Sequence, residues 1–275
     1  MFDTYQDVFD ERGTAYHQAM QRYPSARKQE FELILEMADP RPGQVICDMP
    51  SGGGYLHRFL PTSDLRVIAV ENSQAFFEQC EENAVVEPRL CDLPCTDLSP
   101  ASVDTVVSMA GLHHQNDKRA FFREAHRLLK PGGQLCVADV QSGSAIDGFL
   151  NTFVDEHNSM GHQGAFIEDE VRSDLRTSGF RIEHDRVTPY TWDFDSVEDM
   201  VAFCTLLFGL DQATPQEVLD GIRRYPGYEE REGRCRMNWE LVFLGCEKQK
   251  CEGSRQNGSP KNGSPSRRKP LLEKQ

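Results

Sequence analysis

The chain has 275 residues, which is long enough for one large α/β domain or two smaller ones with a substantial core. Its formal net charge at pH 7 is −14, and because residues 247–275 carry eight Lys or Arg against three Glu, residues 1–246 carry −19. An acidic body repels phosphate backbones, which argues against a nucleic-acid substrate and favours a small or neutral one.

The sequence lacks the marks of a membrane or secreted protein. No run of 18 or more apolar residues occurs, and the start, MFDTYQDVFDERG, has neither the basic beginning nor the apolar run of a secretory signal. The nine cysteines are scattered without paired short spacings, which is typical of reduced, partly buried thiols. We therefore expect a cytoplasmic protein with no membrane span, no disulfide frame and no metal site.

Residues 1–40 are predicted to form an N-terminal helical cap. Within residues 3–38 the segments AYHQAM and RKQEFELILEMA place apolar residues at helical spacing. The next unit, residues 41–246, is predicted to be a single domain.

Short apolar runs alternate with amphipathic segments from Gln44 to about Val140. The runs QVICDM, RVIAVEN, VDTVVSM and QLCVADV are rich in Val and Ile, which is typical of buried parallel strands. The segments SQAFFEQCEENA and DKRAFFREAHRLLK have helical spacing, and the second is expected to stop at the turn Pro131-Gly132-Gly133. Strands alternating with helices predict an α/β fold with a doubly wound, mostly parallel sheet.

Residues 141–236 break this alternation. FRIEHDRV and, just beyond, MNWELVFLGCE read as two more strands, and the intervening segments are predicted to be helical. The region is rich in aromatic residues, namely Phe149, Phe153, Phe166, Tyr190, Trp192, Phe194, Phe203 and Phe208. Two interpretations stay open, a substrate lid over a hydrophobic pocket and ordinary core packing.

The tail, residues 247–275, is predicted to be disordered and basic. It contains NGSP twice and few apolar residues, so it cannot bury enough surface to offset its ordering entropy. A basic tether, with Arg267, Arg268 and Lys269, is the functional alternative.

A glycine loop follows the first predicted strand. QVIC runs into Asp48-Met49-Pro50-Ser51-Gly52-Gly53-Gly54, and the helix-compatible YLHRFL comes next. This arrangement lets a ligand approach bare backbone near a helix N-terminus. A dinucleotide fingerprint would have a third glycine where His57 stands, and an apolar residue in place of Asp48. An NAD or FAD enzyme is therefore disfavoured.

Asp48 with Gly52 and Gly54 resembles the first motif of class I S-adenosylmethionine (SAM)-dependent methyltransferases, an acidic residue followed by alternate glycines. The resemblance implies that Asp48, Ser51 and the loop backbone hold the methionine portion of SAM, whose cationic amino group suits a carboxylate. Pro50 stands in place of the first glycine, so the loop has one N–H donor fewer.

Three further matches follow in order. Glu71, with Asn72 after it, ends RVIAV and is expected to accept the ribose hydroxyls. Asp92 and Leu93 stand where the family places its adenine contacts, and Met109 ends VDTVVSM at the cofactor crevice. The resemblance implies a Rossmann-like sheet of seven strands with the last antiparallel.

The loop after VDTVVSM supplies the candidate catalytic residues, His113 and His114. In the family this loop borders the substrate, and a nucleophile that is a hydroxyl or an acidic carbon gains from a general base, for which histidine is the usual choice near neutral pH. Expected substrate-binding residues are Tyr16 and Arg27 of the cap, with Tyr5 as a further candidate, and His157 and His162 of the lid. Structural packing is the alternative for each of them.

The sequence therefore predicts SAM-dependent methyl transfer by in-line displacement to a small molecule, resembling ubiquinone-type and natural-product methyltransferases. Two alternatives stay open. One is a SAM-binding accessory or regulatory protein without turnover, and the other is a protein methyltransferase with a basic partner. The acceptor and the oligomeric state are not predicted.

Overall fold

The structure, a computed structural model, describes residues 5–249, with side chains from Asp10 onward. Residues 1–4 of the predicted cap and residues 250–275 of the predicted tail lie outside the described residues, as does the side chain of Tyr5. In the described part, no helix combines the length and apolar character needed to cross a membrane.

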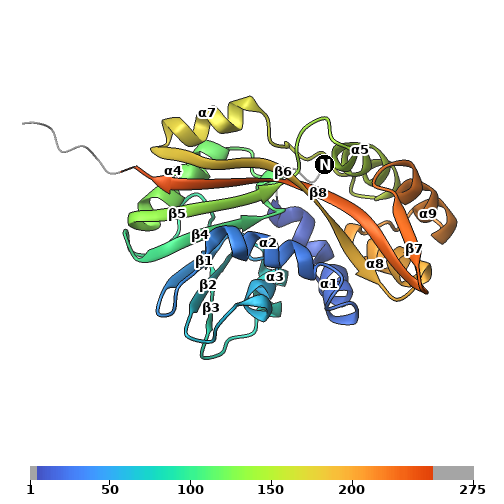
Figure 1. The fold of residues 1–275 in the computed structure, drawn as a ribbon, viewed down its shortest axis with the longest axis horizontal. Coiled ribbons are helices and arrows are strands. Elements are labelled where there is room, and N and C mark those ends of the chain that lie inside the picture. Colours follow the sequence, from blue (N-terminus) through green and yellow to red (C-terminus); the bar gives the residue numbers. More distant parts are fainter. Residues whose placement is uncertain (1–4, 250–275) are drawn as a thin grey trace, which may run out of the picture.

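The central sheet confirms the predicted α/β class (Figure 1). Its strands are β1 (Val45–Asp48), β2 (Arg66–Glu71), β3 (Val86–Leu90), β4 (Val103–Met109), β5 (Leu129–Asp139), β6 (Phe180–Phe194), β7 (Tyr228–Arg231) and β8 (Arg234–Lys248). The order is β3-β2-β1-β4-β5-β8-β6, parallel from β3 to β5, with β8 antiparallel to both β5 and β6. The short β7 pairs with β8 as an unpredicted eighth strand, and β8 runs one residue beyond Glu247, where the tail was predicted to begin.

Helices cover both faces of the sheet. They are α1 (Tyr5–Arg22), α2 (Lys28–Ala38), α3 (Gln74–Gln79), α4 (Lys118–Leu128), α5 (Ala145–Gly148), α6 (Asp155–His157), α7 (Asp169–Thr177), α8 (Val197–Phe208) and α9 (Pro215–Arg224). The described residues also form two short 3₁₀ helices, η1 (Tyr55–Phe59) and η2 (Leu112–His114), and one π-helix, η3 (Phe149–Val154). The expected YLHRFL helix is thus the 3₁₀ turn η1.

Alternation along the strands builds a two-sided core. Ile46 and Val67 belong to the hydrophobic cluster that contains Phe31 of α2, whereas their neighbours Cys47 and Ile68 belong to the cluster that contains residues of α4. Successive side chains of a strand point to opposite faces, so a strand that is apolar at every position needs a helical layer on each side.

The end of α4 differs from the prediction. The helix stops at Leu128, and Leu129 has extended backbone and already pairs with Val103. The residue before a proline is disfavoured in helical geometry, so Lys130 must be extended ahead of Pro131 and the helix ends earlier than the glycines. At the start of α4, the carboxylate of Asp117 caps the helix by accepting a hydrogen bond from N–H of Ala120 at 2.8 Å.

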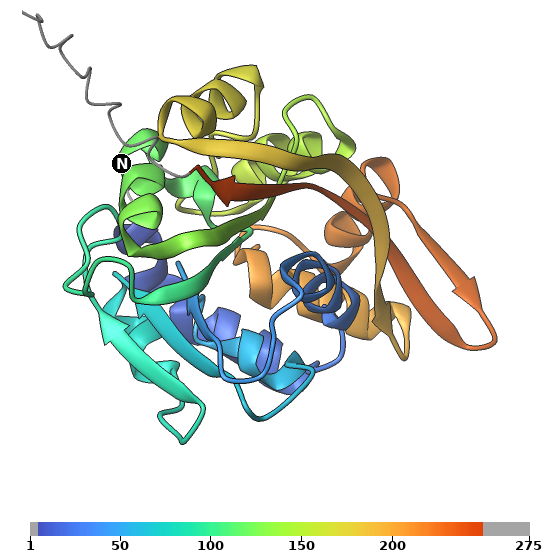
Figure 2. The same ribbon diagram turned by 60° about the vertical axis from the view of Figure 1, so that its left-hand side comes forward.

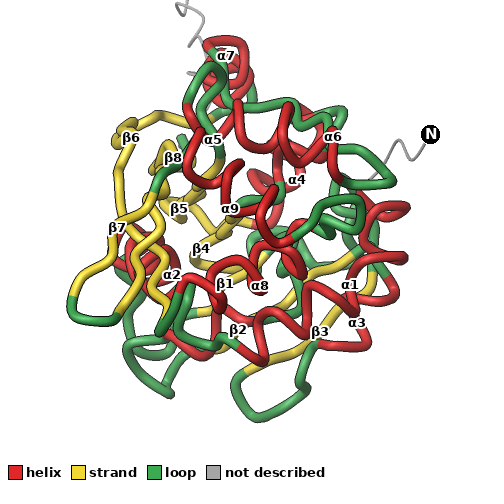
Figure 3. Tube along the Cα trace, turned by 90° about the vertical axis from the view of Figure 1, so that its right-hand side faces the viewer, coloured by secondary structure: helices red, strands yellow, loops and turns green. Residues whose placement is uncertain are grey.

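A second lobe grows from the sheet's far edge. β6 and β8 pair along nearly their whole length and curve away from the parallel strands, and α8, α9 and β7 lie around their far halves (Figures 1 and 2). Viewed from that side, α1, α8 and α9 lie in front of the strands (Figure 3). Most of the region's aromatic residues are buried in this lobe, whereas Trp192 and Phe208 also line a cavity. Core packing therefore accounts for most of these residues, and the substrate lid stays a prediction.

Candidate functional site

The glycine loop lies where β1 ends, between β2 and β4. Its backbone is anchored by N–H of Met49 donating to the carbonyl of Val107 at 2.8 Å and by N–H of Ser51 donating to the carbonyl of Val70 at 3.0 Å. The three glycines after Ser51 all have positive φ, between 57° and 94°. Side chains other than glycine rarely adopt that geometry, so the loop must expose bare backbone.

Pro50 and Gly111 are in close contact across this loop. The Met49–Pro50 peptide is cis, and a Cβ on Gly111 would lie 2.5 Å from Cγ of Pro50. The proline that replaces the usual glycine is therefore accommodated by a glycine in the loop after β4. Sequence reasoning did not single out Gly111, although its place two residues before His113 could have drawn attention to it.

Glu71 holds the glycine loop. It ends β2 and is fully buried, and its Oε1 accepts hydrogen bonds from Oγ of Ser51 at 3.1 Å and from N–H of Gly52. Burial, followed by the nearby charge of Glu71, raises the pKa of Asp48 well above its ordinary value. A cationic ligand would offset this repulsion, which fits the amino group of SAM.

The other predicted cofactor residues follow the tips of adjacent strands. In the sheet register Asp48 pairs with Ala69 and Glu71 pairs with Leu90, so Asp92 comes two residues after the tip of β3. Asp92 is exposed, whereas Leu93 is fully buried. Met109 lines a narrow cleft, together with Asp48, Pro50, Ser51 and Gly52.

The residues around this cleft have the chemistry and the space to hold SAM. Oδ1 of Asn72 is buried and has no hydrogen-bond partner among the described residues. Such an orphaned acceptor beside the tip of β2 suits a ligand hydroxyl. The positive-φ glycines and the side-chain-free Gly111 leave room for a ligand to approach the backbone. The individual contacts of Glu71, Asp92 and Leu93 with ribose and adenine stay predictions.

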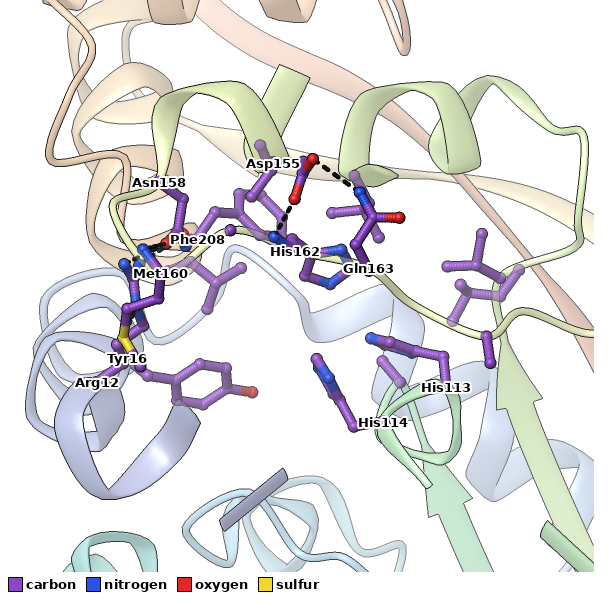
Figure 4. A pocket seen from close by; sticks show the side chains of 18 of the residues that line it. Arg12, Tyr16, His113, His114, Asp155, Asn158, Met160, His162, Gln163 and Phe208 are labelled. Atoms are coloured by element: carbon purple, nitrogen blue, oxygen red, sulfur yellow. Dashed lines mark hydrogen bonds between the residues drawn. The ribbon is translucent and has the colours of Figure 1, made fainter. Parts of the chain in front are cut away.

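A larger cavity adjoins this cleft. Its volume is about 470 Å³, and Tyr16, Arg27 and Ala110 line both spaces. The cavity is closed by α1 on one side, by the loop after η2 on another and by the segment 154–165 above (Figure 4). It brings together predicted residues that are far apart in the chain, namely Tyr16, Arg27, His113, His114 and His162.

His157 is not among the residues that line this cavity. Its ring stacks on Phe153 at 4.3 Å between centroids, and its Nδ1 lies 2.9 Å from the carbonyl oxygen of Phe153. It ends α6, one helical turn after Phe153, so the helix geometry turns its ring back onto that aromatic side chain.

His113 is the best-anchored residue of the cavity. Its Nδ1 lies 2.6 Å from Oδ1 of Asp139, and its backbone N–H donates to Oδ2 of the same carboxylate at 3.0 Å. Burial acts to raise the pKa of Asp139, but His113 and the backbone donors bring it below the ordinary value. A carboxylate only accepts hydrogen bonds, so Nδ1 of His113 carries a proton and is taken up by Asp139, which leaves Nε2 as the ring nitrogen for other contacts.

His114 and His162 surround His113. The ring centroids are 4.1 Å apart for His113 and His114, 5.6 Å for His113 and His162, and 5.3 Å for His114 and His162. Burial, then the charge of His113, lowers the pKa of His114 well below its ordinary value. The same causes lower the pKa of His162 to about 3. Both side rings are therefore neutral at physiological pH.

Arg27, which was predicted to bind substrate, lines the cavity with its guanidinium already paired. The guanidinium already donates to Glu30 through Nε and Nη2 and to the hydroxyl of Tyr16 through Nη1 at 2.5 Å. Glu30 is fully buried and also accepts from Nε1 of Trp192 at 2.8 Å. Because the charge of Arg27 is balanced by Glu30, this end of the cavity is polar and neutral overall.

Arg12 joins α1 to the lobe above the cavity. Its guanidinium donates to Oδ1 of Asn158, to the carbonyl oxygens of Phe208 and Gly209, and to Sδ of Met160 at 2.9 Å. Neither Arg12 nor Asp139 was singled out from the sequence. Both could have been found from their positions in the sequence. Arg12 precedes Tyr16 by four residues and so lies on the same face of the helix, and Asp139 ends a strand as Asp48 does.

The comparisons with known proteins indicate a methyltransferase domain. Residues 47–137 match a family model described as a methyltransferase domain. The chain is 33% identical over 123 residues to a ubiquinone/menaquinone biosynthesis C-methyltransferase of Rubrivivax gelatinosus, which covers 44% of this chain and 49% of the relative. It is 23% identical over 242 residues to a malonyl-acyl-carrier-protein O-methyltransferase of Pseudescherichia vulneris, with 83% of this chain and 93% of the relative covered.

A solved structure has the same fold. Phosphoethanolamine N-methyltransferase 2 of Haemonchus contortus, in complex with phosphomonomethylethanolamine and S-adenosylhomocysteine, superimposes with a TM-score of 0.60 and 17% identity over 90% of this chain and 60% of that chain. The chain spans less than half the length of three curated relatives that it matches, between 35% and 49%. Residues 47–137 thus form a methyltransferase domain, and the chain is similar there to SAM-dependent methyltransferases, a similarity that supports S-adenosyl-L-methionine as the cofactor.

Proposed function

We propose that this protein transfers the methyl group of SAM to a small-molecule acceptor that binds in the 470 Å³ cavity. The observation that carries this proposal is the continuity of lining residues between that cavity and the glycine-loop cleft, through Tyr16, Arg27 and Ala110. An acceptor in the cavity thus lies beside the cofactor. Reaction by in-line displacement requires this proximity and the exclusion of water.

The size and lining of the cavity support a small acceptor with an apolar body. Small-molecule sites span roughly 300–1,000 Å³ and combine apolar walls with a few polar groups. Here the apolar wall includes Trp192, Phe208 and Trp239, and the polar groups cluster at the histidines and at the pair Arg27–Glu30. The relatives named above carry O-, N- and C-methyltransferase names, so the acceptor atom is left open among these three.

The chain's own residues would perform three tasks. When bound, SAM supplies a methyl group activated by its cationic sulfur. Asp48 and the glycine loop hold the cofactor's amino-acid end, and Glu71 keeps that loop in place. His113 orients the acceptor's nucleophilic atom by accepting a hydrogen bond at Nε2, because Asp139 fixes the proton at Nδ1.

The bond changes balance at this atom. A bond forms between the acceptor atom and the methyl carbon while the bond from that carbon to sulfur breaks, and the acceptor's proton passes to Nε2 of His113. His114 lies beside His113 and would help to orient the acceptor. The roles of both histidines belong to the proposal.

The experiment incubates the full chain with methyl-labelled SAM, a small-molecule extract and, separately, an extract of basic proteins. The proposal expects label in a small molecule with the wild-type chain and much less with Asp48→Ala at a limiting concentration of SAM. Label only in the protein fraction would overturn it in favour of a protein methyltransferase. Absence of label in both fractions, with SAM binding intact by calorimetry, would overturn it in favour of an accessory protein.

A further inference from the structure

Three imidazoles from two distant segments meet at one corner of the cavity. His113 and His114 belong to η2, after β4, and His162 belongs to the segment above the cavity (Figure 4). One ring nitrogen from each residue lies within 4.8 Å of the others. His113 is buried and the other two are partly buried, so their nitrogens face the cavity and one another more than bulk solvent.

Hydrogen bonds fix the tautomers of two of these rings. Nδ1 of His113 donates to the carboxylate of Asp139 at 2.6 Å. Nδ1 of His162 lies 3.1 Å from Oδ1 of Asn151, and that oxygen also accepts from the backbone N–H of Gly164 at 2.7 Å. The Asn151 side-chain atom that accepts from N–H of Gly164 is the amide oxygen, and an amide oxygen cannot donate. In its hydrogen bond with His162 the donor is therefore Nδ1 of His162, which carries the proton. In both rings Nε2 is therefore the nitrogen left to bind an ion.

The segment that carries His162 is tied down over η2. The backbone N–H of His162 donates to Oδ1 of Asp155 at 2.6 Å, and N–H of Ala165 donates to the carbonyl oxygen of His113 at 2.9 Å. The second of these bonds joins the two histidine-bearing segments directly. The closeness of the rings is thus built into the backbone and does not depend on side-chain rotamers alone.

We infer that His113, His114 and His162 form a binding site for a divalent transition metal ion, with the ion's open coordination position facing the cavity. Three imidazoles with one open position are the ligand set of a catalytic zinc site. Asp139 and Asn151 would be the acceptors that orient ligating histidines from behind, as metal sites usually require. Bonds of about 2.0–2.1 Å to zinc need the nitrogens roughly 3.3 Å apart, and small rotations of the rings supply that approach.

The metal site would sharpen the proposed function by naming the acceptor class, and in this respect it rests on that function. An ion at this corner binds an acceptor through a hydroxyl, enol or carboxylic oxygen and lowers the pKa of its O–H group. The proton then leaves to water, the oxygen attacks the methyl carbon, and the bond from carbon to sulfur breaks. Metal binding would occupy Nε2 of His113, so in the loaded protein the ion replaces this residue as the acidifying group.

Direct titration with Co²⁺ tests the site without any acceptor or cofactor. The full chain, purified with a chelator and then freed of it, is titrated with Co²⁺ alone and followed by its visible absorption, which is strong for four-coordinate cobalt. We expect one ion per chain, and at least about tenfold weaker binding in His114→Gln and His162→Gln. Asn151→Ser should weaken binding by roughly 10–100-fold through loss of the acceptor that orients His162.

The matched control is His184→Gln, since His184 is an exposed histidine on β6. Circular dichroism and urea unfolding of each variant show whether it folds. Equal Co²⁺ binding by the wild type, His114→Gln, His162→Gln and His184→Gln would overturn the inference, and so would no binding by folded wild-type protein. SAM binding by calorimetry and label transfer after chelation are measured in parallel, so that failure of the metal site is distinguished from failure of the methyltransferase proposal.

Discussion

Nδ1 of His113 and Oδ1 of Asp139 are 2.6 Å apart, and the second oxygen of that carboxylate accepts from the backbone N–H of the same histidine. One carboxylate at the tip of β5 thereby fixes the position, the tautomer and the backbone of a residue that follows β4. Adjacent parallel strands make this possible, since Met109 pairs with Ala138 in their register.

Asp139→Asn tests this relationship. An amide has one acceptor and one donor side, so either N–H of His113 or N–H of Val140 would face an N–H₂ group in place of an oxygen. We expect the free energy of unfolding to fall by about 1–3 kcal/mol and methyl transfer to fall by roughly 100-fold or more. Urea denaturation and initial rates measure the two effects.

Asp185→Asn is the control for this substitution. Asp185 pairs with Arg172 at the surface, and such a pair is worth no more than about 1 kcal/mol. An Asp139→Asn variant as stable and active as Asp185→Asn would contradict the role given to Asp139.

Asp48→Ala and Glu71→Ala should each weaken SAM binding. Asp48 loses a carboxylate that meets a cationic amino group, and Glu71 loses the acceptor that holds Ser51 and Gly52. Loss of a charged hydrogen bond costs about 1.5–3 kcal/mol, or roughly 10–100-fold in Kd. Calorimetry measures it, with the exposed Glu36→Ala on α2 as the control. Unchanged affinity in both variants would refute the cofactor site.

The carboxylate of Asp48 should make SAM affinity depend on pH. The pKa of Asp48 is raised by burial and by Glu71, and SAM binds its ionised form. Affinity should therefore be full above the raised pKa and be lost as the pH falls through it, beginning above the ordinary value of 3.8. Asp48→Asn should bind weakly at every pH and lack this transition. A wild-type affinity independent of pH down to 3.8 would exclude the carboxylate as the ligand.

Gly111→Ala should displace the glycine loop. Gly111 has φ −138°, so alanine brings no backbone strain, and the effect comes from a Cβ placed 2.5 Å from Cγ of Pro50. Overpacking of this kind costs about 1–3 kcal/mol of stability, and we expect SAM affinity to fall with it. Adding Pro50→Ala removes the clashing ring and should restore part of both losses in a double-mutant cycle. If the losses of stability and SAM affinity in the two single variants simply add in the double variant, the two residues are not coupled by this contact.

Arg12→Ala should loosen the lobe above the cavity. The substitution removes the donors to Asn158, Phe208 and Gly209 that tie the lobe to α1. We expect faster amide hydrogen exchange in residues 158–164 and 205–211 and a higher KM for the acceptor, with little change in SAM affinity. Arg22→Ala, an exposed arginine at the end of the same helix, is the control. Equal exchange in the two variants would show that Arg12 does not close the cavity.

The cofactor side of the site could be predicted from the sequence because it follows a rule of parallel sheets. The carboxyl ends of β1, β2 and β4 meet at one edge, so Asp48, Glu71 and Met109, which end consecutive apolar runs, had to lie near each other. Pro50 was recognised as a departure, but its partner Gly111 was not, because a contact between two loops leaves no periodic pattern.

The acceptor side depended on tertiary packing. His113 and His162 are 49 residues apart, and what joins them is a loop bonded to η2 through Ala165 and a ring oriented by Asn151. Arg27 and His157 are residue types that often bind ligands. In the folded chain, however, Glu30 balances the charge of Arg27, and the ring of His157 stacks on Phe153. Strand patterns predict where backbone ends meet, because their spacing is regular. Which side chains face one cavity depends on how irregular segments pack against each other, and only the folded chain decides that.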